Sequence, residues 1–175
     1  MDDRTQPPLN NGMPVTIFDK DLTGNFYVEE DIDLNEVVQS ALQKSSGDRK
    51  DWLILRSDKL PLVCGSRYQV VQLFEAIVSM IINHPPANSK LFLYIKCVAE
   101  ERDPEVLDLR LSPGYGIYQL HFYTNITTGS DWQLVYKDQL VSCGLTAQDY
   151  KGSFAFHPIS NTGCLFSLTL PGKIS

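Results

Sequence analysis

Apolar residues recur at helical spacing along the stretch QVVQLFEAIVSMIINHPP, residues 69–86. The apolar positions are Val70, Phe74, Ile77, Val78, Ile81 and Ile82. A thin polar line runs along another side of the same segment and is formed by Gln69, Gln72, Glu75, Ser79 and Asn83. The pattern predicts a helix that ends at the proline pair 85–86, with a polar line that faces either solvent or a ligand.

Two further segments have helical patterns. In DIDLNEVVQSAL, residues 31–42, Asp33 is a candidate N-cap before an apolar face. The segment WQLVYKDQLVSC, residues 132–143, predicts a helix that ends at Gly144.

Apolar runs with alternation predict the strands. The segment DWLILRSD is expected to bury Trp52 and Ile54. The predicted strands are 51–58, 90–100 and 106–112, followed by a hairpin of 152–159 and 164–171 around SNTG. Residues 118–131, YQLHFYTNITTGSD, are interpreted as mostly loop, and residues 1–12 as a flexible lead.

The order of these elements predicts a fold class. A helix, a strand and a second helix are followed by strands, a helix and a hairpin, with no internal repeat. We expect residues 13–175 to form a single domain, a two-layer α/β (α+β) sandwich with a mixed sheet and helices on one face.

Composition and charge exclude several classes of protein. Of the 175 residues, 43% are hydrophobic and 21% are charged, which is typical of a globular chain. The formal charge of −6 disfavours binding to nucleic acid or to an anionic membrane. The polar N-terminal residues lack the apolar core of a signal peptide, and no apolar run is long enough to span a bilayer, so we expect a cytoplasmic location.

The four cysteines give no metal-ligand pattern. None stands in a CxxC pair or at metal-ligand spacing from a histidine, and each lies in or beside an apolar run. We expect buried, reduced thiols and no structural metal.

Four stretches, in this order, resemble the ATP-binding domain of histidine kinases, which belongs to the GHKL superfamily. They are GSRYQVVQLFEAIVSMIINHPP, LDLRLSPGYGI, FYTNITTGSDWQLVYKDQLV and YKGSFAFHPISNTGCLFSLTLP. Together with DIDLNEVVQSAL they cover about residues 31–171. The resemblance implies the GHKL (Bergerat-like) fold and, in active members, a site for Mg-ATP.

The helix of residues 69–82 departs from the family pattern. Met80 stands where the family has the asparagine that coordinates magnesium, and a thioether is a poor ligand for that ion. Ala76 stands one turn earlier, where the family has a glutamate or asparagine that acts on water. A register shifted by one residue would pair Glu75 with Ser79 instead, and it also lacks the asparagine.

The two glycine motifs that the resemblance implies are altered as well. In SPGYG, Ser112 replaces the adenine-binding aspartate, while Gly114 and Gly116 are retained. In DWQL, Asp131 and Gln133 replace both glycines of the phosphate-binding turn GxGL. Asp131 is expected to cap the following helix, and its charge would repel a phosphate.

Histidines and aromatic residues complete the candidate chemistry. No histidine has the sequence context of the family's phospho-acceptor, so His84, His121 and His157 are interpreted as surface or edge residues. Aromatic residues gather around the former lid, and two interpretations stay open. They fill the core or plug the vacated pocket, which we favour, or they form a contact surface for a partner. The residues are Tyr115, Tyr118, Phe122, Tyr123 and Trp132.

Three functional hypotheses follow from the resemblance. The first is a non-catalytic, pseudokinase-type domain without a cofactor that binds a histidine kinase, a response regulator or another signalling protein. The second is a diverged domain that still binds ATP or ADP, with Glu75 or Asn83 as a new magnesium ligand and Gly129 in a new phosphate cradle. The third is a pocket for a different small ligand, because the lost charges leave an apolar cavity.

Overall fold

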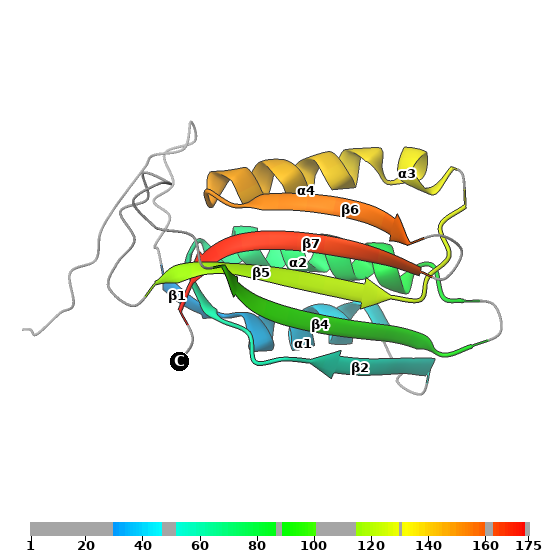
Figure 1. Ribbon diagram of the computed structural model, residues 1–175, viewed down its shortest axis with the longest axis horizontal. Helices are drawn as coiled ribbons and strands as arrows, with labels where there is room; N and C mark the ends of the chain where they lie inside the picture. The colour runs from blue at the N-terminus through cyan, green and yellow to red at the C-terminus, as the bar shows by residue number, and fades with distance from the viewer. Residues whose placement is uncertain are drawn as a thin grey trace, which may run out of the picture.

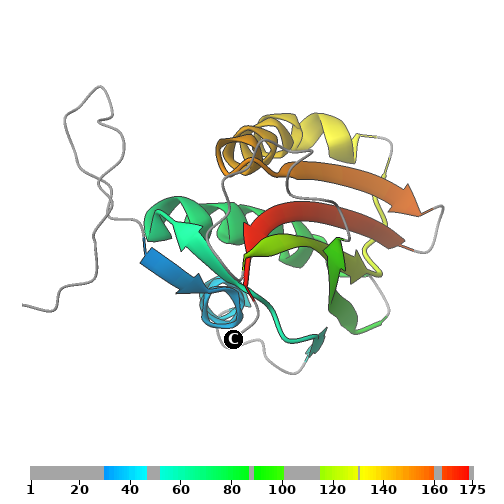
Figure 2. The ribbon, with the colours of Figure 1, turned by 60° about the vertical axis from the view of Figure 1, so that its left-hand side comes forward.

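The computed structural model describes residues 30–46, 52–86, 89–100, 115–129, 131–159 and 163–173. These residues form two layers, a five-stranded mixed sheet and a set of helices on one of its faces (Figures 1 and 2). This confirms the predicted fold class. The predictions for the N-terminal lead, the strand 106–112 and most of the SNTG turn lie outside the described residues.

The first helix begins where the sequence predicts. α1 (Leu34–Ser46) follows β1 (Glu30–Asp33), and the Oδ1 atom of Asp33 accepts a hydrogen bond of 2.8 Å from the amide of Asn35. This bond satisfies one amide that the first helical turn leaves without a partner. β1 pairs antiparallel with β3 (Leu62–Gly65) in a small second sheet that the sequence pattern did not predict.

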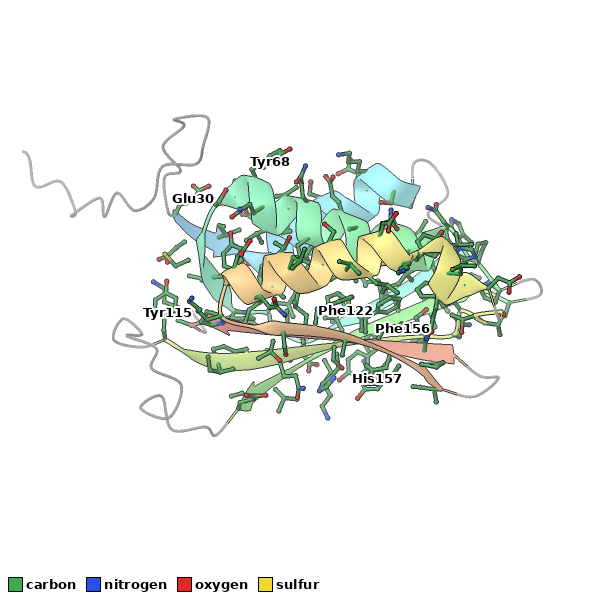
Figure 3. All side chains as sticks on the ribbon, turned by 90° about the horizontal axis from the view of Figure 1, so that it is seen from above. Glu30, Tyr68, Tyr115, Phe122, Phe156 and His157 are labelled. Atoms are coloured by element: carbon green, nitrogen blue, oxygen red, sulfur yellow. The ribbon has the colours of Figure 1, made fainter. Side chains whose placement is uncertain are left out.

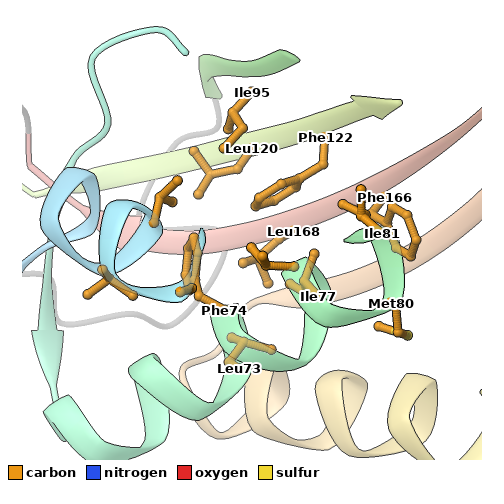
Figure 4. Packing of buried hydrophobic residues seen from close by; sticks show 14 of the residues in the cluster. Leu73, Phe74, Ile77, Met80, Ile81, Ile95, Leu120, Phe122, Phe166 and Leu168 are labelled. Atoms are coloured by element: carbon orange, nitrogen blue, oxygen red, sulfur yellow. The ribbon is translucent and has the colours of Figure 1, made fainter. Parts of the chain in front are cut away.

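The helix with the polar line is α2 (Arg67–Ile82). It contacts α1 on one side and α4 (Lys137–Asp149) on the other. Its apolar face packs on the sheet, where Phe74 meets Phe122 edge to face with the ring centroids 6.0 Å apart (Figure 4). α2 ends before Asn83 and the proline pair, as predicted.

The main sheet has the strand order β2-β4-β5-β7-β6. β2 (Leu53–Ser57) runs parallel to β4 (Leu91–Glu100), and the other neighbours are antiparallel. β5 (Gly116–Thr124) lies at the centre. β6 (Ser153–Ile159) and β7 (Gly163–Gly172) form the predicted hairpin.

The interpretation of residues 118–131 as mostly loop was wrong for the first half of the segment, because residues 118–124 belong to the central strand β5. Leu120 and Phe122 point into the core, whereas His121 and Tyr123 lie on the face away from the helices. Polar and aromatic residues alternate with apolar ones here because only one face of the strand is covered. That mixture hid the strand.

Two other local predictions also need correction. Ile54 is 48% exposed rather than buried, because β2 is an edge strand. The predicted helix after residue 131 is split at Tyr136 into α3 (Trp132–Val135) and α4, and α4 continues through Gly144 to Asp149.

The cysteines differ in their surroundings. Cys143 and Cys164 are buried, Cys97 is half-buried and Cys64 is exposed, so the expectation of burial was wrong for Cys64. No helix in the described part of the chain has the length and apolar character to cross a membrane.

Candidate functional site

The α2 residues predicted to line a nucleotide pocket include one that lies in the core. Met80 is fully buried, and it points from α2 toward α4, as Leu73 does two turns earlier (Figure 4). Ala76, one turn before Met80, is half-buried. Met80, which the sequence resemblance places at the magnesium-binding asparagine, is therefore part of the apolar contact between two helices.

The polar line of α2 does not converge on one point. The carboxylate of Glu75 accepts a hydrogen bond of 2.7 Å from Lys44 on α1, which is away from the α4 side. The Ser79 hydroxyl donates to the carbonyl of Ala76 at 3.3 Å. Asn83 is an exposed residue at the C-cap. These three members of the line thus face α1, the helix backbone and solvent.

Trp132 stands where the resemblance places the glycine turn, and it is only 4% exposed. Its ring stacks on Phe156 with the centroids 4.5 Å apart, and it contacts Tyr136 at 4.8 Å and Phe166 at 5.9 Å. Its indole nitrogen has no hydrogen-bond partner. An aromatic cluster thus fills the space beneath α3.

One end of the α2–α4 contact is closed by a histidine and a tyrosine. The Nε2 atom of His84 lies 2.7 Å from the hydroxyl oxygen of Tyr136, and the two rings meet edge to face at 5.2 Å. His84 also contacts the Trp132 ring at 6.2 Å. The residue just after α2 is thereby tied to the residue between α3 and α4.

The other end is closed by Tyr150, which follows α4. Its hydroxyl accepts a hydrogen bond of 3.0 Å from the amide of Ser66. The hydroxyl hydrogen lies between two acceptors, the Ser66 carbonyl at 3.1 Å and the Gln69 side-chain oxygen at 3.3 Å. The ring passes so close to Gly65 that a Cβ there would lie 2.2 Å from Cε1 of Tyr150. The two tyrosines thus hold α4 against α2 along its length.

No protein-family model and no curated protein matches the chain. Solved structures do match its fold. The mycobacterial sensor histidine kinase MprB superposes with a TM-score of 0.61 at 13% identity, covering 85% of this chain and 100% of that chain. The catalytic domain of histidine kinase ThkA gives 0.57 at 12%, covering 84% and 99%. The ATP-binding domain of PrrB from Mycobacterium tuberculosis gives 0.55 at 13%, covering 82% and 97%.

The fold is that of a histidine-kinase ATP-binding domain. At these identities the likeness concerns the fold, and the chemistry of the site must be read from the residues themselves. The architecture confirms what the sequence resemblance implied.

Within this histidine-kinase fold, the remaining predicted pocket residues do not form one site. Asp131 precedes α3, but its side chain makes no capping hydrogen bond, so the expected cap was wrong. Gly129 is exposed, and its carbonyl accepts the Trp132 amide at 3.1 Å. Gly116 is the half-buried first residue of β5. Ser112 and Gly114 lie outside the described residues.

Gln133 belongs to a groove on the outer side of α4. This groove has a volume of about 350 Å³ and lies between α4 and the edge strand β6. Its lining is Gln133, Lys137, Leu140, Val141, Phe154, Ala155 and Phe156. The replaced glycine position therefore faces away from the α2–α4 contact.

Thr124 is a position that sequence reasoning missed. β5 occupies the place next to β4, ends at Thr124 and leads within a few residues into α3. Thr124 is buried, and its hydroxyl accepts the amide of Ile126 at 3.4 Å. A neutral hydroxyl therefore lies at the carboxyl end of β5, just before the loop that leads to α3. The alternation of polar and apolar residues over 118–124 could have indicated this strand and its end, but the segment was interpreted as loop.

The predicted aromatic cluster is divided among several places. Trp132 lies beneath α3 and Phe122 lies in the main core, whereas Tyr123 lies on the opposite face of the sheet and stacks with Tyr94. The Tyr115 hydroxyl donates a hydrogen bond to Asp31. The core-filling interpretation holds for Trp132 and Phe122 but not for Tyr123.

The titratable group buried between α4 and the core is a thiol. Burial raises the pKa of Cys143 to about 12, so this group is neutral at physiological pH and is neither a nucleophile nor a ready metal ligand. The described ranges contain no group of three or more histidine, cysteine or acidic side chains placed to hold a metal ion.

Proposed function

We propose that the chain is a non-catalytic histidine-kinase-like ATPase domain that acts as a protein-interaction module in two-component-type signal transduction. Its partners would be signalling proteins, such as a histidine kinase or a response regulator, and it would work in the cytoplasm without ATP or magnesium. The solved structures with this fold are named as histidine kinases, which supports the choice of pathway.

The observation that carries this proposal is the packing of Trp132. A phosphate-binding turn needs backbone amides that a phosphate can approach closely, which glycine permits and a buried indole does not. Trp132 is wedged among Phe156, Phe166 and Tyr136, all within 6 Å by ring centroid. Opening this turn would disrupt the core beneath α3.

The helix contact adds a second obstacle to Mg-ATP. Magnesium prefers oxygen ligands, and the nearest candidates on α2 are engaged or misplaced. Glu75 pairs with Lys44 on the α1 side, and Ser79 bonds its own helix backbone. Met80 offers only a buried thioether.

The absence of a carboxylate at the end of β5 has a similar effect on adenine. The family's aspartate accepts a hydrogen bond from the adenine amino group, whereas Thr124 offers a neutral hydroxyl already used by Ile126. The sequence resemblance instead places Ser112 at the position of this aspartate, and the Ser112 hydroxyl is also neutral. Whichever of the two residues occupies the position, recognition of adenine would be weak.

The test is a calorimetric titration of the chain with Mg-ADP and with a non-hydrolysable ATP analogue at millimolar ligand. The ATP-binding domain of PrrB, titrated under the same conditions, is the positive control. We expect no binding heat and no shift in melting temperature for this chain. Magnesium-dependent binding in the micromolar range would favour the alternative, a diverged domain that still binds ATP or ADP.

A further inference from the structure

The face of the main sheet turned away from the helices carries aromatic, aliphatic and cationic side chains. On β4, Leu91, Leu93 and Ile95 are buried under the helices, so the alternate positions point to the other side. Figure 3 places His157 on that side, opposite Phe122 and Phe156. We call this surface the open face.

One row of side chains crosses the open face from edge to edge. Strand registers align, in order, Arg56, Tyr94, Tyr123, Leu165 and His157. The Arg56 guanidinium lies 6.0 Å from the centre of the Tyr94 ring. The Tyr94 and Tyr123 rings stack with centroids 6.0 Å apart and an interplanar angle of 22°. The row is therefore an ordered array rather than a set of loose surface residues.

A small apolar pocket lies beside this row. Its volume is about 180 Å³, and Phe92, Tyr123 and Ile159 line it together with the start of β7. Phe92 is 38% exposed and Ile159 is 42% exposed. Pockets for small-molecule ligands are usually larger, roughly 300–1,000 Å³. This one suits a single large apolar side chain.

The described strand positions of the open face carry two cations and one carboxylate, whereas the whole chain is acidic. The chain has 21 acidic and 15 basic residues, yet Arg56 and Lys96 project from this face. The nearby Asp58 is occupied, because its carboxylate accepts the Cys97 amide at 3.0 Å and the Tyr94 hydroxyl at 3.2 Å. Glu100, the acidic residue among the described strand positions of this face, lies at the far end of β4.

The surroundings of His121 agree with a cationic face. This residue pairs in register with Lys96 and lies 3.1 Å, from its Nδ1 atom, from the Ser167 hydroxyl. Burial lowers the pKa of His121, and the positive charge of Lys96 lowers it further. Lys96 is thus close enough to His121 to affect its protonation.

We propose that the open face docks an acidic polypeptide segment of a partner protein. One large apolar side chain would fill the pocket at Phe92, and flanking carboxylates would meet Arg56 and Lys96. This inference rests on the proposed role as an interaction module, and it adds the surface and the chemistry of the partner. Complementary charge would set the orientation of the segment, and the pocket would supply its anchor.

The stacking geometry favours a polypeptide over single-stranded nucleic acid. Binding of bases needs free aromatic faces. Here Tyr94 is covered by Arg56 on one side and Tyr123 on the other, and Tyr123 also contacts His121 at 5.9 Å. The rings therefore present edges rather than faces.

The test is a selection from a library of random dodecapeptides against the full chain, followed by affinity measurement of the enriched peptides. The docking variant carries Arg56→Glu and Lys96→Glu. A matched control carries Lys137→Glu and Arg67→Glu on the helical layer, with the same change in net charge. Phe92→Ala tests the pocket, and Leu134→Ala, at a residue 75% exposed on α3, is its control.

The expected result is enrichment of peptides with several carboxylates around one large apolar residue. Their affinity should fall about tenfold or more in the docking variant and in Phe92→Ala, but little in either control. Failure to enrich acidic peptides, equal loss in the helical control, or tighter binding of a single-stranded oligonucleotide would overturn the inference. The calorimetric titration with nucleotide tests the helical layer, whereas the peptide selection tests the open face. A failure of the proposed function is therefore distinguishable from a failure of this inference.

Discussion

The hydroxyl of Tyr150 lies 3.0 Å from the amide nitrogen of Ser66, so the residue after α4 is tied to the residue before α2 across 84 positions of the sequence. Together with the pair of His84 and Tyr136 at the opposite end, this bond fixes the distance between the two helices. In this account, the contact between α2 and α4 is a permanent part of the core and not a site that opens for a nucleotide.

Tyr150→Phe should destabilise the domain by about 1–3 kcal/mol, because the buried amide of Ser66 loses its acceptor. The measurement is the free energy of unfolding from urea denaturation. Tyr68→Phe is the matched control, since Tyr68 is 65% exposed and its hydroxyl meets only Gln72. Equal effects of the two variants would mean that the Tyr150 bond contributes nothing special.

Trp132→Ala should cost about 3–5 kcal/mol of unfolding free energy, because it removes a large buried ring from the aromatic cluster. Trp132→Phe should cost less, since it keeps a ring and removes an indole N–H that has no partner. Leu134→Ala, next to it but exposed, should change the stability by no more than about 0.5 kcal/mol. A mild effect of Trp132→Ala would show that the cluster is loosely packed.

Met80→Asn places an asparagine where the sequence resemblance puts the family's magnesium ligand, but it should not create nucleotide binding. The amide would enter an apolar contact and should destabilise the domain by roughly 1–3 kcal/mol. Met80→Leu keeps the volume and should cost less than about 1.5 kcal/mol. Calorimetry and urea denaturation of both variants check these expectations, and nucleotide binding by Met80→Asn would contradict the account.

Gly144→Ala should stabilise the domain by about 1 kcal/mol, because glycine is a poor helix former and an added Cβ meets no atom within 4 Å. Gly65→Ala should have the opposite effect, since its Cβ would lie 2.2 Å from the Tyr150 ring. The two melting temperatures, measured side by side, should move in opposite directions. A shift in the same direction would contradict the described packing.

The cysteines should differ in reactivity and in their effect on alkaline stability. Burial raises the pKa values of Cys143 and Cys164 from 9.0 to about 12 in the folded chain. Both thiols then favour the folded state fully below the unfolded pKa of 9.0, and that contribution is lost as the pH rises from there toward about 12. Near neutral pH, a thiol reagent should modify Cys64 rapidly and reach Cys143 and Cys164 only upon unfolding. Rapid modification of all four thiols would contradict the burial.

The sequence predicted those elements whose apolar residues follow one clear period. α2, β4 and β7 have one strongly buried side, so the alternation or the helical stripe is visible in the residues. The predictions for Ile54 and Gly144 failed because their surroundings depend on residues that are distant in the sequence. Ile54 is exposed because β2 lies at the sheet edge, and Gly144 continues a helix because α4 packs on α2 and β6.

The candidate site was less predictable than the fold. Nothing in the sequence placed Tyr150 beside Ser66 or Trp132 against Phe156. Such contacts join residues that are far apart along the chain. The loop interpretation of residues 118–131 also hid Thr124, because a strand covered on one face has a composition similar to that of a loop.

The most direct test of the central claim is a ¹H–¹⁵N correlation spectrum of the chain recorded with and without millimolar Mg-ADP. The Trp132 indole N–H is a direct reporter, because it lies in the aromatic cluster where the sequence resemblance places the family's glycine turn. The amides of Ala76 and Met80 report on α2. The account predicts that none of these signals moves. Saturable, magnesium-dependent shifts at Trp132 and Met80 together would contradict it and would assign a working nucleotide site to the domain.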